Sequence, residues 1–173
     1  GGVALNCVAN GKILKEKILE GTDIIDLAFD YKNRLWIGTE VRGLFIVDKK
    51  TIKNIDISQI SNKTYAIRKI AFDKNKNALL AIDRLGLFVL NEEFKIIKSY
   101  SHDADNENSI SQNSIYAIYV DDINAYWLGA REGGINIIYE NNNAFARVRC
   151  SGSAFLCRCN CSCTRIGNEP YID

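Results

Sequence analysis

The chain has 173 residues, of which 47% are hydrophobic and 25% charged, as is typical of a globular domain. The formal net charge of +1 gives no electrostatic indication of nucleic-acid or membrane-surface binding, and no apolar run reaches the roughly 20 residues of a membrane span. Met is absent and no signal-peptide pattern is present, which favours an excised piece or a mature product. The one His, His102, restricts Ser-His-Asp and Cys-His chemistry, and its polar surroundings favour a solvated loop residue.

The first segment, residues 1–20, resembles the second half of a unit that recurs further along the chain. Gly2 precedes Gly43 by 41 residues, which is close to the later period. This register favours native sequence at Gly1 and Gly2, and an artificial leader is the alternative. We therefore expect a half unit at residues 1–20.

Three full units follow at residues of about 21–60, 61–105 and 106–149. Each contains four short segments rich in Ile, Val, Phe and Tyr, separated by Asp, Asn, Lys and Gly, which predicts strands joined by tight turns. The expected strands are 23–30, 34–39, 43–48 and 52–57, then 66–73, 78–83, 86–91 and 94–100, then 114–121, 125–130, 134–140 and 144–149.

The three units share residues at fixed offsets from an aspartate. The aspartates are Asp30, Asp73 and Asp121, and the offsets of six, eight and thirteen residues hold Trp36, Leu79 and Trp127, then Gly38, Ala81 and Gly129, then Gly43, Gly86 and Gly134. We expect the tryptophans to pack between blades, the small residues to allow close backbone approach, and the last glycines to open the third strand after a turn. Leu79 in place of Trp makes the second unit a degenerate copy. These roles are structural.

Four strands in about 43 residues are typical of a β-propeller blade. The predicted fold is therefore all-β, with about three and a half blades of four antiparallel strands over residues 1–149. One long meander folded into sandwiches is the alternative. Because an open arc leaves strand edges and blade faces uncovered, we expect a fragment of a larger propeller, completed by its remaining blades or by a second copy.

The last segment, residues 150–173, differs from the rest. It holds all the cysteines except Cys7, and no Lys occurs from residue 147 onward. Cys157, Cys159, Cys161 and Cys163 alternate with polar residues, so an extended segment would place their thiols on one face. A soft metal site or disulfides are conceivable, but zinc sites favour two-residue gaps within a Cys pair. A non-native or poorly ordered tail is the preferred interpretation, and we predict neither metal nor cofactor.

A ligand would bind where the loops between second and third strands meet the loops that join successive blades. Each unit places an acid and a base in its second-to-third-strand loop, and the stretch from residue 101 to 113 adds a long polar connection. Mixed charges suit a polar, hydroxyl-rich ligand, although a solvated turn surface is the simpler interpretation. The candidate residues are Glu40, Arg42, Asp83, Arg84, His102, Asp103, Arg131 and Glu132.

Three groups of residues resemble the two-component regulator propeller repeat. They are Asn108, Ser109, Ile110, Ser111, Asn113 and Ile115 before the last unit; Asp30, Leu35, Trp36, Ile37, Gly38, Thr39, Gly43 and Leu44 in the first; and Asp121, Trp127, Leu128, Gly129, Gly133, Gly134 and Ile135 in the third. The resemblance extends over residues 1 to about 149. The second unit departs from the pattern, and family members usually have more blades.

This resemblance implies the periplasmic sensor region of an inner-membrane hybrid histidine kinase, which detects glycan-derived oligosaccharides and signals through a phosphorelay. The chain contains no kinase His motif, nucleotide-binding box or receiver Asp cluster, so the resemblance implies a sensor piece without catalysis of its own. Two other functions stay open at this point: a protein-interaction propeller, and a fragment of a propeller lyase or hydrolase. The sequence does not name the ligand.

Overall fold

The computed structural model spans residues 1–173 and describes residues 3–9, 12–49, 51–55, 57, 60, 63, 65–140, 144–149 and 162–165. Within these residues the secondary structure consists of strands and turns, without a helix. No helix long and apolar enough to span a membrane therefore occurs in that part of the chain.

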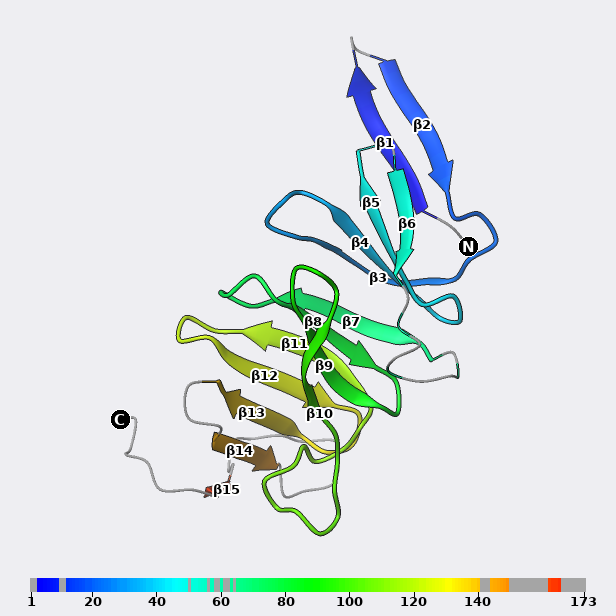
Figure 1. Ribbon diagram of the computed structural model, residues 1–173. Coiled ribbons are helices and arrows are strands. Elements are labelled where there is room, and N and C mark those ends of the chain that lie inside the picture. The colour runs from blue at the N-terminus through cyan, green and yellow to red at the C-terminus, as the bar shows by residue number, and fades with distance from the viewer. Residues whose placement is uncertain are drawn as a thin grey trace. The chain divides into compact units, whose positions relative to one another are not determined.

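The strands form antiparallel sheets in which neighbours along the chain are neighbours in the sheet (Figure 1). A two-stranded sheet contains β1 (Val3–Ala9) and β2 (Lys12–Ile18). The first four-stranded sheet contains β3 (Ile24–Phe29), β4 (Leu35–Thr39), β5 (Leu44–Asp48) and β6 (Thr51–Ile55). The second contains β7 (Ile67–Phe72), β8 (Ala78–Ile82), β9 (Gly86–Leu90) and β10 (Ile96–Tyr100).

The third large sheet has five strands: β11 (Ile115–Val120), β12 (Ala125–Ala130), β13 (Ile135–Tyr139), β14 (Ala144–Arg149) and β15 (Ser162–Arg165). β15 pairs antiparallel with β14 and contains Cys163. The other tail cysteines lie outside the described residues, so the thiol arrangement predicted for the tail stays a prediction.

The predicted fold class is confirmed. Every strand segment expected between residues 23 and 149 forms a strand, with small shifts at the ends. Each of the three units makes one antiparallel sheet whose strands follow in chain order, which is the architecture of a propeller blade. We refer to these sheets as the first, second and third blades.

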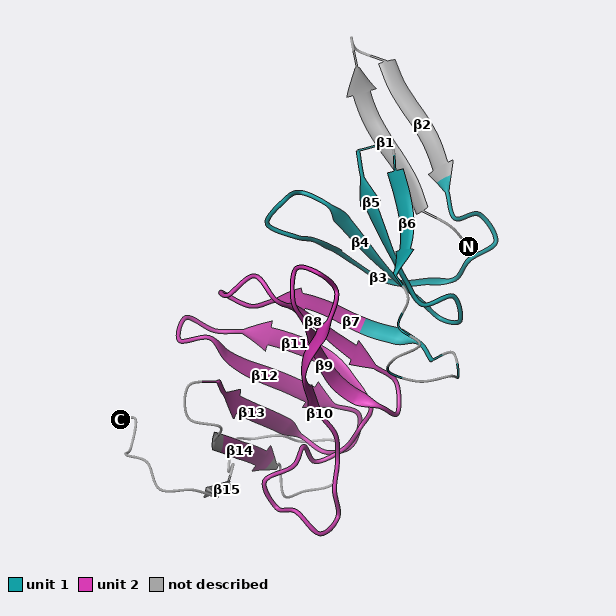
Figure 2. Cartoon of the chain, in the orientation of Figure 1, with its two compact units in different colours: residues 1–68 teal, residues 69–173 magenta. Residues whose placement is uncertain are grey.

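The chain divides into two compact units, residues 1–68 and 69–173, and the boundary falls within β7 (Figure 2). In the first unit, side chains from one face of the first blade pack with Ile18 at the end of β2. This core cluster consists of Ile18, Leu35, Ile37, Phe45 and Val47. Ile18 therefore supplies apolar cover to the first blade.

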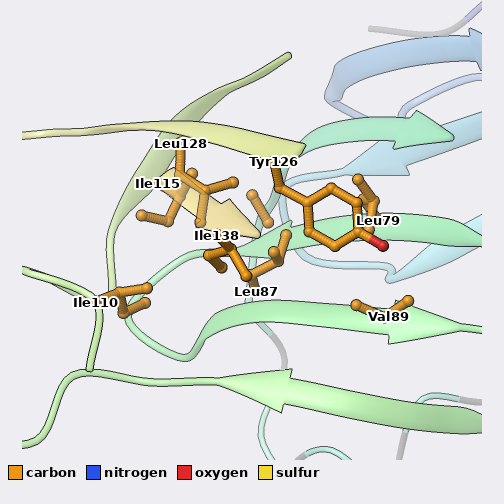
Figure 3. Close-up of a cluster of buried hydrophobic side chains, with 9 residues drawn as sticks. Leu79, Leu87, Val89, Ile110, Ile115, Tyr126, Leu128 and Ile138 are labelled. Carbon is orange, nitrogen blue, oxygen red and sulfur yellow. The ribbon is translucent and has the colours of Figure 1, made fainter. Parts of the chain in front are cut away.

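In the second unit, the second and third blades share one apolar cluster (Figure 3). Its members are at most 1% exposed: Leu79, Ala81, Leu87 and Val89 from the second blade, and Ile110, Ile115, Tyr126, Leu128 and Ile138 from the third blade and the connection before it. Burial of this area supplies about 25 cal/mol per Å² of apolar surface removed from water, and it holds these two sheets together.

A hairpin built on the repeated aspartate joins the first two strands of each blade. In the first blade Asp30 Oδ1 accepts hydrogen bonds from the amides of Lys32 and Arg34, both 2.9 Å long. Asn33 has a φ of 60°, and Lys76 and Asn124 take the same left-handed conformation in the other blades. An Asp whose carboxylate caps a type I turn, followed by a left-handed residue, is a common hairpin connection. The aspartate therefore has a local, turn-forming role.

The second carboxylate oxygen of the aspartate accepts an indole N–H in the first and third blades and takes other partners in the second. Trp36 Nε1 donates to Asp30 Oδ2 over 2.9 Å, and Trp127 Nε1 donates to Asp121 Oδ2 over 2.8 Å. In the second blade Leu79 replaces the Trp. There Asp73 Oδ2 accepts from Asn77 Nδ2 and, across the sheets, from the Tyr126 hydroxyl, each over 2.8 Å. The degenerate blade thus satisfies its aspartate with a residue of the next blade.

These contacts change the pKa of Asp30 and of Tyr126. Burial raises the pKa of Asp30, but the indole of Trp36 and the amide, guanidinium and positive charge of Arg34 outweigh burial and lower the pKa below its ordinary value. The pKa of Tyr126 is raised by burial first, and then by the hydrogen bond to Asp73 and its negative charge. Asp30 is therefore held ionised and Tyr126 neutral.

Two glycines occupy positions where a side chain would not fit. A Cβ at Gly38 would lie 2.9 Å from both the Cγ2 atom and the carbonyl oxygen of Ile67. Gly86 has a φ of 104°, and a Cβ there would lie within 3 Å of the Tyr100 carbonyl oxygen. The neighbouring strand therefore leaves no room for a side chain at Gly38, and the positive φ at the start of β9 favours glycine at position 86.

Candidate ligand-binding site

The charged residues proposed to meet a ligand lie in loops at one end of the sheets, and the structure distributes them between the two units. Glu40 and Arg42 belong to the first unit. The other six belong to the second unit, and we describe each group by itself.

In the first unit both charged side chains engage neighbouring residues. Arg42 Nη1 donates to the Thr22 hydroxyl over 2.6 Å, and its guanidinium lies 5.5 Å from the centre of the Phe45 ring. Glu40 Oε2 accepts from Arg68 over 3.3 Å. Because these side chains are held by partners, they present fixed rather than freely moving charges at the loop surface.

In the second unit Ser114 links two of the predicted loops. Its hydroxyl donates to Asp83 Oδ1 over 3.1 Å, and its carbonyl accepts from the Arg131 amide over 2.9 Å. The Glu132 amide donates to Gln112 Oε1 over 3.1 Å. The loop of the second blade, the loop of the third blade and the end of the long connection therefore form one continuous polar surface.

Three charged side chains of that surface extend into solvent. Arg84 is 79% exposed, Arg131 63% and Glu132 76%. Arg84 Nε lies 3.9 Å from Asp83 Oδ2, and Arg131 Nε lies 3.9 Å from Glu132 Oε1. Exposed pairs at this distance are weak and exchange partners readily, so the guanidinium groups remain able to bind an oxygen-rich ligand.

The long connection, residues 101–114, is folded by its own hydrogen bonds. The His102 amide donates to Asn113 Oδ1 over 2.6 Å, and His102 Nδ1 lies 2.9 Å from the Ile110 carbonyl oxygen. Since a carbonyl only accepts, this contact places a proton on Nδ1 and leaves Nε2 as an acceptor in the neutral ring. Asp103 Oδ1 accepts from the Asp105 amide, so that carboxylate caps a turn.

Residues that the sequence did not single out as site residues fix this connection on the third blade. Arg147 Nε donates to the Ser109 carbonyl oxygen over 3.2 Å. The Ser111 amide donates to Asn136 Oδ1 over 2.8 Å, and Asn136 is fully buried. The signal was present in part, because Asn136 is a polar residue inside an apolar strand. The connection is therefore a structured element that presents residues 103–108 to solvent.

The arrangement suits recognition of a polar ligand better than acid–base chemistry. Of the candidate residues in the second unit, His102 uses Nδ1 on a backbone carbonyl and Asp103 caps a turn. Asp83 and Glu132 each lie near an arginine. No group of three His, Cys, Asp or Glu that could hold a metal ion occurs among the residues that the structure describes.

A sequence model described as two component regulator propeller matches residues 18–41. A search of curated proteins found no match.

Two solved structures share the blade arrangement. One is the extracellular domain of BT3049, described as a hybrid two component system of B. thetaiotaomicron, with a TM-score of 0.64 and 23% identity over 82% of this chain. The other is the extracellular domain of BT4673, described in the same way and from the same organism, with a TM-score of 0.62 and 26% identity over 80% of this chain. This chain spans 19% of the length of each.

Proposed function

We propose that this chain belongs to the two component regulator propeller family and is a ligand-sensing segment of a larger propeller in a hybrid two-component sensor. The observation that carries the proposal is the propeller repeat at residues 18–41 in a chain whose blades superimpose on extracellular domains of such systems. The proposed location is outside the cytoplasm, in the periplasm, as part of an inner-membrane protein.

The proposed ligand is an oligosaccharide derived from a complex glycan. Its hydroxyl groups both donate and accept hydrogen bonds, and the polar surface around Ser114 offers both kinds of partner in Arg84, Arg131 and Glu132. Side chains held by neighbouring residues, such as Glu40 and Arg42 of the first unit, lose less conformational entropy on binding, which favours affinity for a flexible sugar chain. In the first unit, Glu40 and Arg42 are proposed as ligand-binding residues of that unit's own loop.

The proposed output is a signal passed across the membrane to a histidine kinase and a phosphorelay outside this segment. Binding can bias such a switch only if the ligand prefers one of two states of the sensor. The segment itself is proposed to be non-catalytic and to use no cofactor, because its charged loops offer hydrogen-bond partners without a general acid–base pair in the described residues.

A titration of the whole chain with a panel of purified plant and host glycan oligosaccharides, followed by calorimetry, tests the proposal. Arg84→Ala and Arg131→Ala are each expected to weaken binding about tenfold, the loss of a charged hydrogen bond. Lys95→Ala is the matched control, because Lys95 is also exposed but lies in the turn before β10, at the other end of the sheet. An equal loss in the control contradicts the proposed site, and the absence of binding across the panel contradicts the ligand class. Capture of a protein partner by the same surface would favour the scaffold alternative.

A further inference from the structure

An aromatic side chain lies close to the polar surface of the second unit. Tyr116, on β11, follows Ser114 by two residues, so their Cα atoms are at most about 7 Å apart. Ser114 donates to Asp83 and accepts from the amide of Arg131. Tyr116 is 43% exposed and lies outside the apolar cluster that the second and third blades share. That cluster therefore does not account for a large aromatic residue at this position.

A β-bulge in the first strand of the third blade contains Tyr116. The register of β11 against β12 shifts by one residue between Ile115 and Ala117, which makes Tyr116 the additional residue. The first blade has the same shift, between Ile24 and Asp26. Bulges re-aim side chains and are frequent next to binding sites. The bulge therefore takes Tyr116 out of the regular alternation of its strand.

The repeat indicates where the Tyr116 side chain lies. The position five residues before the repeated aspartate holds Ile25 in the first blade, Arg68 in the second and Tyr116 in the third. Arg68 Nη1 donates to Glu40 Oε2 over 3.3 Å, and Glu40 lies ten residues after the aspartate of the preceding blade. The residue ten after the aspartate of the blade that precedes Tyr116 is Asp83. We therefore expect the tyrosine ring beside Asp83, on the side of the third blade that faces the second.

The chemistry of this position changes from blade to blade, whereas that of its neighbours does not. The residue before it and the residue two after it are apolar in every blade: Ile24, Ile67 and Ile115, then Leu27, Ile70 and Ile118. The position itself carries an aliphatic residue, a base or an aromatic residue. Such a position suits recognition, because the scaffold stays fixed while the chemistry of the contact varies.

An aromatic ring beside a carboxylate and a guanidinium matches the two kinds of surface of a pyranose. The C–H groups on one face of the sugar ring pack on an aromatic side chain, and the hydroxyl groups at its edge bond to polar partners. Asp83 accepts hydrogen bonds, and Arg84, which is 79% exposed, donates them. Tyrosine has only two side-chain torsions to immobilise, so its contacts cost little entropy.

We propose that Tyr116 is the stacking platform of the candidate site. One pyranose unit of an oligosaccharide lies with its C–H face on the tyrosine ring and its hydroxyl groups toward Asp83 and Arg84. Pyranose chains are therefore preferred over furanose chains, whose five-membered rings present a smaller and less flat C–H face. This inference rests on the proposed function, because it names the residue and the form of sugar that the same site recognises.

The test titrates the whole chain with cellohexaose, xylohexaose, mannohexaose, galactotetraose and a fructofuranose oligosaccharide, and calorimetry gives the dissociation constants. For a pyranose probe that binds, Tyr116→Ala is expected to raise the dissociation constant about tenfold and Tyr116→Phe by no more than about twofold, because the ring makes the contact. Tyr119→Ala is the matched control: Tyr119 is 65% exposed on the same strand, three residues further from the polar surface, and its loss should leave binding unchanged.

A second measurement reports the contact itself in a chain that keeps its fold. In a deuterated chain with protonated tyrosine rings, saturation of the aromatic resonances should reach the C–H protons on one face of a bound pyranose. Tyr116→Phe, prepared with deuterated phenylalanine, should abolish this transfer while the sugar still binds. Transfer that persists in this variant would place the sugar on another tyrosine and overturn the proposal.

The outcomes separate this inference from the proposed function. Equal binding by the wild type and Tyr116→Ala overturns the stacking platform and leaves the proposed function standing, and so does an equal loss in the Tyr119→Ala control. An equal loss in Tyr116→Phe and Tyr116→Ala attributes the contact to the hydroxyl and overturns stacking. Binding of the furanose probe alone overturns the pyranose preference. Absence of binding by every probe contradicts the proposed function, and this inference falls with it.

Discussion

The first and third blades contain the same Asp–Trp hairpin in different surroundings. Asp30 and Asp121 each cap the turn and accept the indole N–H six residues later. Trp36 is 2% exposed, whereas Trp127 is 36% exposed. The comparison shows that the hydrogen bonds of this motif arise locally, while the burial that gives them energetic weight depends on what packs over the sheet.

Removal of the repeated aspartate should give the largest difference in stability loss between the first and third blades. Asp30→Ala leaves Arg34 and the buried indole of Trp36 without their acceptor and is expected to lower the free energy of unfolding by about 3 to 5 kcal/mol. Asp121→Ala exposes its donors to water and should cost about 1 kcal/mol. Urea unfolding followed by circular dichroism measures both. Equal losses would show that burial does not distinguish the motifs.

The two faces of the third blade give the next largest contrast. Leu128→Ala removes a fully buried side chain from the cluster shared with the second blade and should cost about 2 to 5 kcal/mol. Ile135, on the opposite face of the third blade, is 40% exposed. Ile135→Ala should therefore cost less than about 1 kcal/mol. The same unfolding experiment compares them, and a large loss at Ile135 would indicate that its face is already covered in solution.

The hydrogen bond from Tyr126 to Asp73, which joins the third and second blades, can be tested by removing the tyrosine hydroxyl. Tyr126→Phe removes the hydroxyl that donates to Asp73 and should cost about 1 to 3 kcal/mol, because a buried carboxylate loses a partner. Tyr119→Phe is the control, since Tyr119 is 65% exposed. If both variants unfold at the same urea concentration as the wild type, the interblade bond contributes no stability.

The smallest expected effect is a loss of folding stability at low pH. The pKa of Asp30 is lowered in the folded chain because the hydrogen bonds from Trp36 and Arg34 and the charge of Arg34 outweigh burial. A lowered folded pKa means that the contribution to stability is present above the unfolded pKa of about 3.9 and is lost as pH falls through the folded pKa. The urea midpoint of the wild type should therefore decline below about pH 4, and less so in Asp30→Asn. Parallel declines would assign the acid sensitivity to other carboxylates.

Much of the fold followed from local patterns. The strands around Trp36 and Trp127 and the hairpins at Asp30 and Asp121 were predictable because β-branched and aromatic runs favour strands and Asp caps tight turns. The charged loop residues of the candidate site were predictable as a set. Their partners were not: Ser114 bridges two loops, and the sequence gives no signal for contacts between residues 31 positions apart.

By itself, then, the sequence determined the unit of the structure, a four-stranded antiparallel sheet repeated along the chain, because strand alternation and turn chemistry act over a few residues. Only the tertiary structure decided which faces of these sheets are covered, that Asp73 takes its partner from Tyr126 of the next blade, and that Arg147 fixes the long connection at Ser109. The physical reason is that burial and long-range hydrogen bonds depend on residues far apart in sequence, and a repeat that is nearly identical locally places its copies in unequal surroundings.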